Sequence, residues 1–105
     1  MFFGGTFIDK EILIQSGINH PIKLEYYKKI NEDYINSFEK KKYGIYIVKT
    51  EYIGNDSKVE TKDIKYVTND EIEENKILTL FKENQVTLIN SEEIISDLFN
   101  KRTDL

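Results

Sequence analysis

The chain has no cysteine and no tryptophan, and only one histidine and one proline among its 105 residues. Without cysteine, the protein can form no disulfide and no cysteine-ligated zinc site, and it has no thiolate nucleophile. No apolar run approaches the roughly 20 residues of a membrane-spanning helix. Residues 1–3 lack the basic segment that begins a signal peptide. We therefore expect a cytoplasmic protein with no membrane partner.

The composition indicates a globular chain. Apolar residues make up 39% and charged residues 32% of the sequence, with seven tyrosines and six phenylalanines. This length suits one domain with one core. We predict a single domain over residues 1–105, with flexible ends at residues 1–5 and 101–105.

The net charge of −4 is unevenly distributed. Residues 1–66 carry eleven Lys and ten Asp or Glu, which gives +1, whereas residues 67–105 carry nine acidic and four basic residues, which gives −5. Binding to nucleic acid normally needs a basic face that releases counterions from phosphates. No such face is evident, so we expect no nucleic-acid partner.

The first third of the chain has the alternation of β-strands. Side chains of residues 6–14 would alternate between two faces that both carry apolar groups, which predicts one strand. Residues 16–21 are rich in turn formers. In residues 22–30, Ile22, Leu24 and Tyr26 share one face, as in a half-buried strand. A helical stripe that runs on to Phe38 is the competing interpretation of residues 22–38.

Residues 43–53 form the clearest predicted strand. Apolar side chains on both faces of its first half predict a central strand covered on both sides. Residues 54–57 predict a hairpin turn, and residues 58–67 the returning strand. In a regular strand Val59 would lie on the opposite face from Ile64 and Tyr66, which predicts a bulge near residues 62–63.

Two helices should follow. Thr68 and Glu71 have capping-box spacing, and the same spacing recurs at Asn90 and Glu93. The buried stripes would contain Ile72, Ile77, Leu80 and Phe81 in the first helix, and Ile94, Ile95, Leu98 and Phe99 in the second. Residues 86–89 would link them as an extended apolar segment. We predict an α+β fold, an antiparallel β meander of about four strands with two C-terminal α-helices packed on one face.

Few residues suggest catalysis. His20 has no partner that spacing can identify, so a solvated turn residue is the simpler interpretation. Residues 4–6 contain a glycine pair, but no phosphate-binding motif follows it. Lysines at positions 28, 29 and 40–42 lie near Tyr26 and Tyr27 and could meet single-stranded nucleic acid. A solvated strand edge explains these lysines more simply.

Several segments resemble a known family. They are residues 11–14, 24–27 and 43–47, then residues 86–89 before residues 93–95. This arrangement resembles a family of small uncharacterised clostridial proteins, a domain of unknown function, over residues 11–100. Where the family pattern has a Pro-Ile-His-like segment, this chain has residues 87–90, so any role of that histidine would be absent. The resemblance implies the fold and no activity.

We predict a non-enzymatic module that binds another protein and needs no cofactor or metal. The predicted partner-binding residues are the carboxylates of the helical third, although helix capping also explains them: Asp70, Glu73, Glu74, Glu92 and Glu93. The sheet is the alternative contact surface, and a homodimer is a further possibility because tyrosine is common at interfaces. The alternative function is an anti-CRISPR-like inhibitor from a mobile element, whose carboxylates occupy a phosphate-binding site. A small enzyme using carboxylates and tyrosines would need a deep polar pocket.

Overall fold

A computed structural model describes the backbone of residues 1–33 and 40–103, and the side chains up to residue 99. The elements in chain order are β1 (Phe2–Phe7), α1 (Lys10–Gln15), β2 (Ile22–Ile30), β3 (Tyr43–Ile53), β4 (Asp56–Thr68), α2 (Glu71–Glu83) and α3 (Ser91–Thr103). None of the described helices is both long and apolar enough to cross a membrane.

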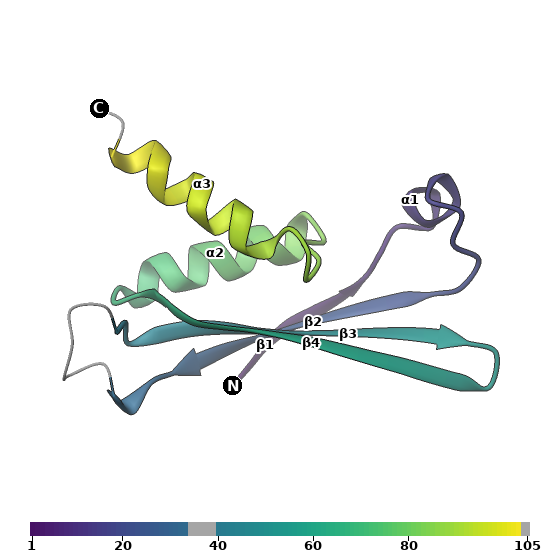
Figure 1. Cartoon of the computed structure of the whole chain (residues 1–105), viewed down its shortest axis with the longest axis horizontal. Coiled ribbons are helices and arrows are strands. Elements are labelled where there is room, and N and C mark those ends of the chain that lie inside the picture. Colours follow the sequence, from purple (N-terminus) through teal and green to yellow (C-terminus); the bar gives the residue numbers. More distant parts are fainter. Residues whose placement is uncertain (34–39, 104–105) are drawn as a thin grey trace.

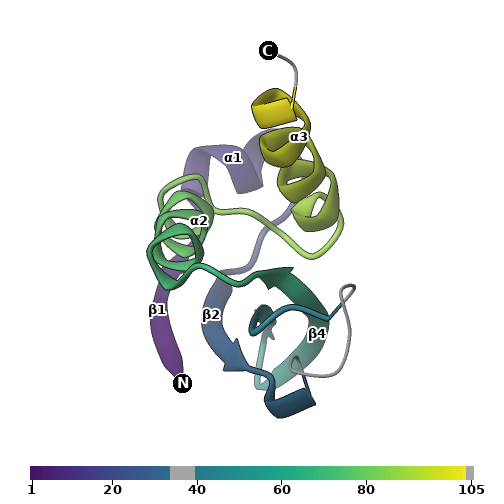
Figure 2. The same ribbon diagram turned by 90° about the vertical axis from the view of Figure 1, so that its left-hand side faces the viewer.

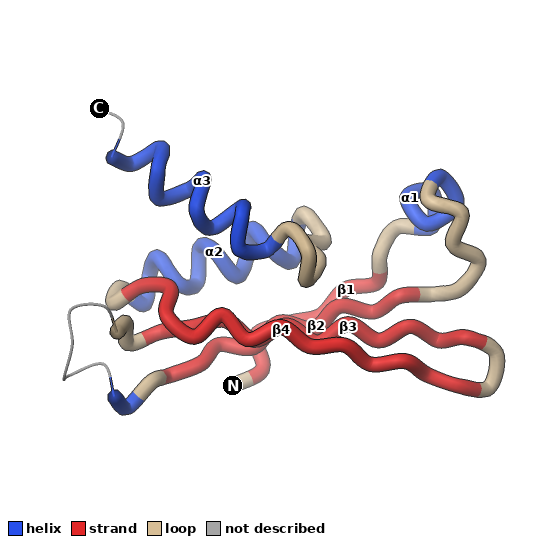
Figure 3. Tube along the Cα trace, viewed as in Figure 1, coloured by secondary structure: helices blue, strands red, loops and turns tan. Residues whose placement is uncertain are grey.

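The four strands form one antiparallel sheet in the order β1-β2-β3-β4, a simple meander. The helices lie on one side of this sheet, which is seen nearly edge-on in Figure 1 and by element type in Figure 3. The view turned by 90° shows α2 above β1 and β2 (Figure 2). The predicted α+β meander with two C-terminal helices on one face is confirmed.

The strand prediction for residues 22–30 is confirmed, and residues 34–38 of the competing helical stripe lie outside the described residues. β2 alternates between buried and half-buried positions, as a strand with one core face should. β3 has the predicted bounds and lies inside the sheet between β2 and β4. The predicted cover on both faces of β3 is wrong, because Tyr46 and Val48 are only half-buried opposite the helices.

A two-residue turn at Gly54 and Asn55 joins β3 to β4, and Gly54 has a positive φ of 62° that suits glycine. The bulge in β4 lies later than predicted. Tyr43 pairs with Thr68 and Ile45 with Ile64, so residues 65–67 of β4 oppose the single residue 44 of β3, and the bulge lies there rather than at 62–63. They bend over Gly44, where an added Cβ would lie 2.2 Å from the Lys65 carbonyl oxygen. The missing side chain at position 44 therefore decides where β4 bends.

Both C-terminal helices are confirmed, but their first turns differ from the prediction. Asp70 rather than Thr68 caps α2, with its side chain accepting a 2.9 Å hydrogen bond from the Ile72 N–H. Asn90 accepts a hydrogen bond from the Thr87 N–H at the start of α3. Ile72, predicted to be buried, is 67% exposed because the turn of α2 points its side chain away from the sheet. Residues 86–89 form an irregular turn instead of an extended segment.

The predicted strand over residues 6–14 is wrong. β1 ends at Phe7, and Lys10–Gln15 forms the short helix α1, in which only Leu13 is buried. Three consecutive apolar residues fit a strand with two apolar faces and also fit one turn of helix, so periodicity could not separate the two. Gly17 follows α1 with a positive φ of 74°, which ends the helix.

The described parts of both chain ends belong to regular elements, and the predicted flexibility of residues 1–5 and 101–105 stays a prediction. Residues 2–5 are part of β1, in which Phe2, Gly4 and Gly5 pair with β2. Residues 101–103 continue α3, while residues 104–105 lie outside the described residues. The core lies between the sheet and the helices, and its buried members are Leu24, Tyr26, Ile45, Ile47, Ile64, Val67, Ile77, Leu78, Phe81, Val86 and Ile95.

Candidate interaction surface

The five predicted partner-binding carboxylates do not form one surface. Asp70 caps α2, and Glu73 accepts a 2.8 Å hydrogen bond from the Thr68 hydroxyl. Glu92 lies 3.2 Å from the Lys62 ammonium and joins α3 to β4. Glu93 is exposed on α3. Three of these side chains therefore contact groups of their own chain, and the charge of Glu92 is paired with a cation.

Glu74 is the clearest correction, because its side chain is fully buried beneath α2. Neither of its carboxylate oxygens has a hydrogen-bond partner among the described residues. Burial raises the pKa of Glu74 from 4.5 to about 8, although the positive charge of Lys28 acts in the opposite direction. A buried carboxyl without partners is far more stable in its neutral form. Glu74 cannot contact a partner protein.

The predicted basic-aromatic cluster is also divided by the sheet. Tyr26 and Lys28 point to the helix side, where Tyr26 is in the core and Lys28 is 9% exposed. The Lys28 ammonium lies 3.4 Å from Glu71. Tyr27 and Lys29, their neighbours in sequence, point to the opposite face. Alternation along β2 therefore separates residues that appear as one cluster in the sequence.

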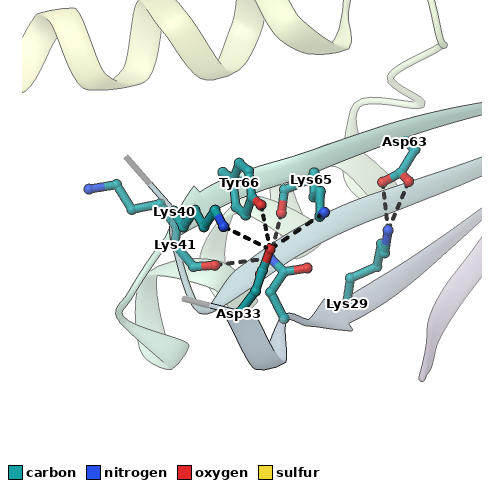
Figure 4. A network of polar contacts seen from close by, with 8 residues as sticks. Lys29, Asp33, Lys40, Lys41, Asp63, Lys65 and Tyr66 are labelled. Atoms are coloured by element: carbon teal, nitrogen blue, oxygen red, sulfur yellow. Dashed lines mark hydrogen bonds and ion pairs between the residues drawn. The ribbon is translucent and has the colours of Figure 1, made fainter. Parts of the chain in front are cut away.

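Asp33 lies between Lys40 and Lys65 at one end of the sheet (Figure 4). It accepts a 2.8 Å hydrogen bond from the Tyr66 hydroxyl, and the ammonium groups of Lys40 and Lys65 lie 3.6 Å from it. The Tyr66 hydrogen bond, followed by the charges of Lys65 and Lys40, lowers the pKa of Asp33. Lys29 likewise contacts both oxygens of Asp63 at 2.8 Å. These lysines are thus paired with carboxylates of their own chain.

His20 is not a solvated turn residue. Its Nε2 lies 2.8 Å from the Glu51 carboxylate, and this hydrogen bond, with the charge of Lys49 acting in the same direction, lowers the pKa of Glu51. His20 borders a half-open pocket of about 460 Å³ beside α1. The lining is mainly apolar and includes no hydroxyl, thiol or carboxylate side chain: Phe7, Ile8, Lys10, Leu13, Ile14, Ile18, Asn19, His20 and Pro21. This pocket does not have the polar lining that the small-enzyme hypothesis requires.

The sheet face opposite the helices carries an unusual number of apolar side chains. We call it the open face, since no described helix or strand covers it. Strand register places seven large apolar residues there: Phe2, Phe7, Tyr27, Tyr46, Tyr52, Val48 and Val59. A sheet face in contact with water normally carries polar residues.

The aromatic rings of the open face form a row across three strands. The ring centroids of Phe2 and Tyr27 are 5.4 Å apart, and those of Tyr27 and Tyr46 are 6.1 Å apart, both edge to face. Phe7 and Tyr52 make a second contact at 6.4 Å. The row was missed in the sequence because its members come from β1, β2 and β3, and only the strand register aligns them.

Comparison with known proteins places the chain in a family without assigning it an activity. No curated protein and no solved structure matches it. A model of a family of unknown function (DUF6514) matches residues 10–101, nearly the whole chain. The chain therefore belongs to this family of unknown function.

Proposed function

We propose that this protein is a protein-binding module and that the open face of its sheet is the contact surface. The aromatic row of Phe2, Tyr27 and Tyr46 is the observation that supports the proposal. Contiguous apolar patches on soluble proteins commonly mark interaction sites, and tyrosine and phenylalanine are enriched in them. The core on the other side of the sheet fixes the backbone of the strands, and the rings contact one another, so little conformational entropy is lost on binding.

The charges around the row favour a protein partner with an apolar, nearly uncharged patch. Lys29 is neutralised by Asp63 at 2.8 Å, and the Tyr27 hydroxyl donates a 3.3 Å hydrogen bond to Glu25. Lys23 and Glu25 add one charge of each sign to the same face. A single-stranded nucleic acid would require lysines available to phosphate as well as rings. The rings here stand against one another, and the face has no excess of positive charge.

The inhibitor hypothesis depends on carboxylates presented as a row. Glu74 is buried, and Asp70, Glu73 and Glu92 each have a partner within the chain. This arrangement favours the open face of the sheet, rather than the acidic helices, as the contact surface. A cytoplasmic location and a clostridial source stay predictions.

Photo-crosslinking can test the surface in cells of the native host. A benzoylphenylalanine residue at position 46 would lie on the open face, whereas one at position 72 would lie on the exposed side of α2. We expect a discrete covalent adduct from position 46 and none from position 72. Adducts formed from position 72 alone would overturn the proposed surface.

The captured partner, once purified, allows a quantitative test by calorimetry. The double variant Tyr27→Ser/Tyr46→Ser should weaken binding about tenfold or more, since aromatic anchors carry most of the energy of such interfaces. The matched double variant Glu92→Lys/Glu93→Lys should bind within about twofold of the unmodified protein. The reverse ranking would assign the contact to the acidic helices.

A further inference from the structure

The two edges of the sheet differ in how they are protected against pairing with another chain. β4 forms one edge, and charges of both signs are spread along it: Lys58, Glu60, Lys62, Asp63 and Lys65. β1 forms the other edge and contains no charged residue and no proline. Charges and prolines are the usual means by which proteins block pairing at an exposed edge. The protection is present at β4 and missing at β1.

The backbone of β1 has groups available at this edge. The Ile8 N–H donates a 2.9 Å hydrogen bond to the Ile22 carbonyl, which makes this a hydrogen-bonded pair of the ladder. Hydrogen-bonded and non-bonded pairs alternate in an antiparallel ladder. Thr6 and Gly4 therefore pair inward with β2, and the N–H and C=O groups of Gly5 and Phe7 face outward.

The side chains at the two ends of β1 suit a second copy of the same strand. Phe2 and Phe7 both lie on the open face, and each is 55% exposed. Antiparallel pairing of two β1 strands brings the Phe2 end of one copy to the Phe7 end of the other. The strand is uncharged, so no like charges meet across the two-fold axis. On the helix side, Lys82 and Glu83 line a pocket together with Phe3 and Thr6 of β1, and their charges have opposite signs.

We propose that two copies of this chain pair through their β1 edges in a two-fold symmetric dimer with a continuous eight-stranded sheet. A two-fold axis perpendicular to the sheet keeps both open faces on the same side. The two aromatic rows then become neighbours, and the exposed rings of Phe2 and Phe7 are covered at the junction. The contact is short, so the dimer should dissociate on dilution.

Sedimentation equilibrium of the isolated protein tests the dimer without any partner, so the result is independent of the proposed function. Between about 10 µM and 1 mM, the mass should rise toward twice the 12.4 kDa monomer. Phe7→Pro removes an outward N–H while leaving the inward ladder intact, and it should remain monomeric. Phe7→Thr keeps this N–H and should still dimerise, with affinity reduced less than about tenfold by the loss of the ring.

Circular dichroism and thermal unfolding of both variants confirm that the monomer fold is retained. If the Phe7→Pro variant unfolds, the edge contact is tested instead by measuring amide hydrogen exchange in the unmodified protein. Slow, concentration-dependent exchange of the Gly5 and Phe7 amides then supports the edge contact. A protein that stays monomeric at about 1 mM overturns the proposal, as does a folded Phe7→Pro variant that dimerises like the original.

Discussion

The Tyr26 hydroxyl donates a 2.7 Å hydrogen bond to the carbonyl oxygen of Val86, sixty residues further along the chain. Tyr26 lies on β2, and Val86 lies in the turn between α2 and α3. The Tyr26 ring also contacts Phe81 of α2 edge to face, with 6.2 Å between ring centroids. One buried side chain thus joins the middle of the sheet to the turn that directs α3 back over the core.

Replacing Tyr26 should measure what this contact contributes. Tyr26→Phe leaves the Val86 carbonyl buried without a donor and should lower the free energy of unfolding by about 1–3 kcal/mol. Tyr46→Phe is a matched control, because the Tyr46 hydroxyl has no hydrogen-bond partner among the described residues, and its effect should stay within about 0.5 kcal/mol. Urea denaturation of both variants checks the difference. Equal effects would contradict the role given to Val86.

Gly44 should be intolerant of any side chain. An added Cβ would lie 2.2 Å from the Lys65 carbonyl oxygen and 2.6 Å from that of Ile64. We expect Gly44→Ala to destabilise the protein by about 3 kcal/mol, because the bulged backbone of β4 must move away. Gly54→Ala meets no neighbouring atom and should cost only about 1–2 kcal/mol, from its positive φ. Thermal unfolding of the two variants tests this order.

The buried Glu74 predicts an unusual dependence of stability on pH. Its pKa is 4.5 as a reference and about 8 in the fold, so between these values the folded state holds a proton that the unfolded state has lost. The free energy of unfolding should therefore fall as pH rises through this window, by up to about 1.4 kcal/mol per pH unit. Above about pH 8 the loss should level off.

Glu74→Gln should remove this slope and make the protein more stable than the original near pH 8. Glu93→Gln, at an exposed position, should leave the slope unchanged. Lys28→Met should raise the pKa of Glu74 further, since it removes the charge that favours the carboxylate. Denaturant titrations between pH 4 and 9 measure all three variants. A Glu74→Gln protein that keeps the full slope would show that other groups cause it.

The lowered pKa of Asp33 predicts the opposite dependence of stability on pH, a loss of stability in acid. Its pKa is lowered, chiefly by the Tyr66 hydroxyl, so its contribution to stability is present above the ordinary pKa and lost as pH falls through the lowered value. Tyr66→Phe should move the pKa of Asp33 upward, toward the reference of 3.8. Carboxyl carbon chemical shifts followed by NMR measure the change directly. Tyr52→Phe serves as the control and should leave the pKa of Asp33 unchanged.

The strands and helices with strong local signals could be predicted from the sequence. Residues 43–53 alternate clearly, and the turn at Gly54 needs a positive φ that glycine provides. Residues 10–15 could not be assigned in this way, because three adjacent apolar residues satisfy both a strand and one turn of helix. The bulge in β4 was displaced from its predicted place because its cause, the missing side chain of Gly44, lies on the neighbouring strand.

The sequence by itself determined the fold class, the strands β2, β3 and β4 and the two C-terminal helices, because hydrophobic periodicity and turn chemistry act over short distances. Only the tertiary structure decided which of the charges and rings are exposed, paired or buried. It buried Glu74, paired Glu92 with Lys62, and placed Phe2, Tyr27 and Tyr46 in one row. Strand register and helix rotation set these positions, and both depend on contacts between residues far apart in the chain.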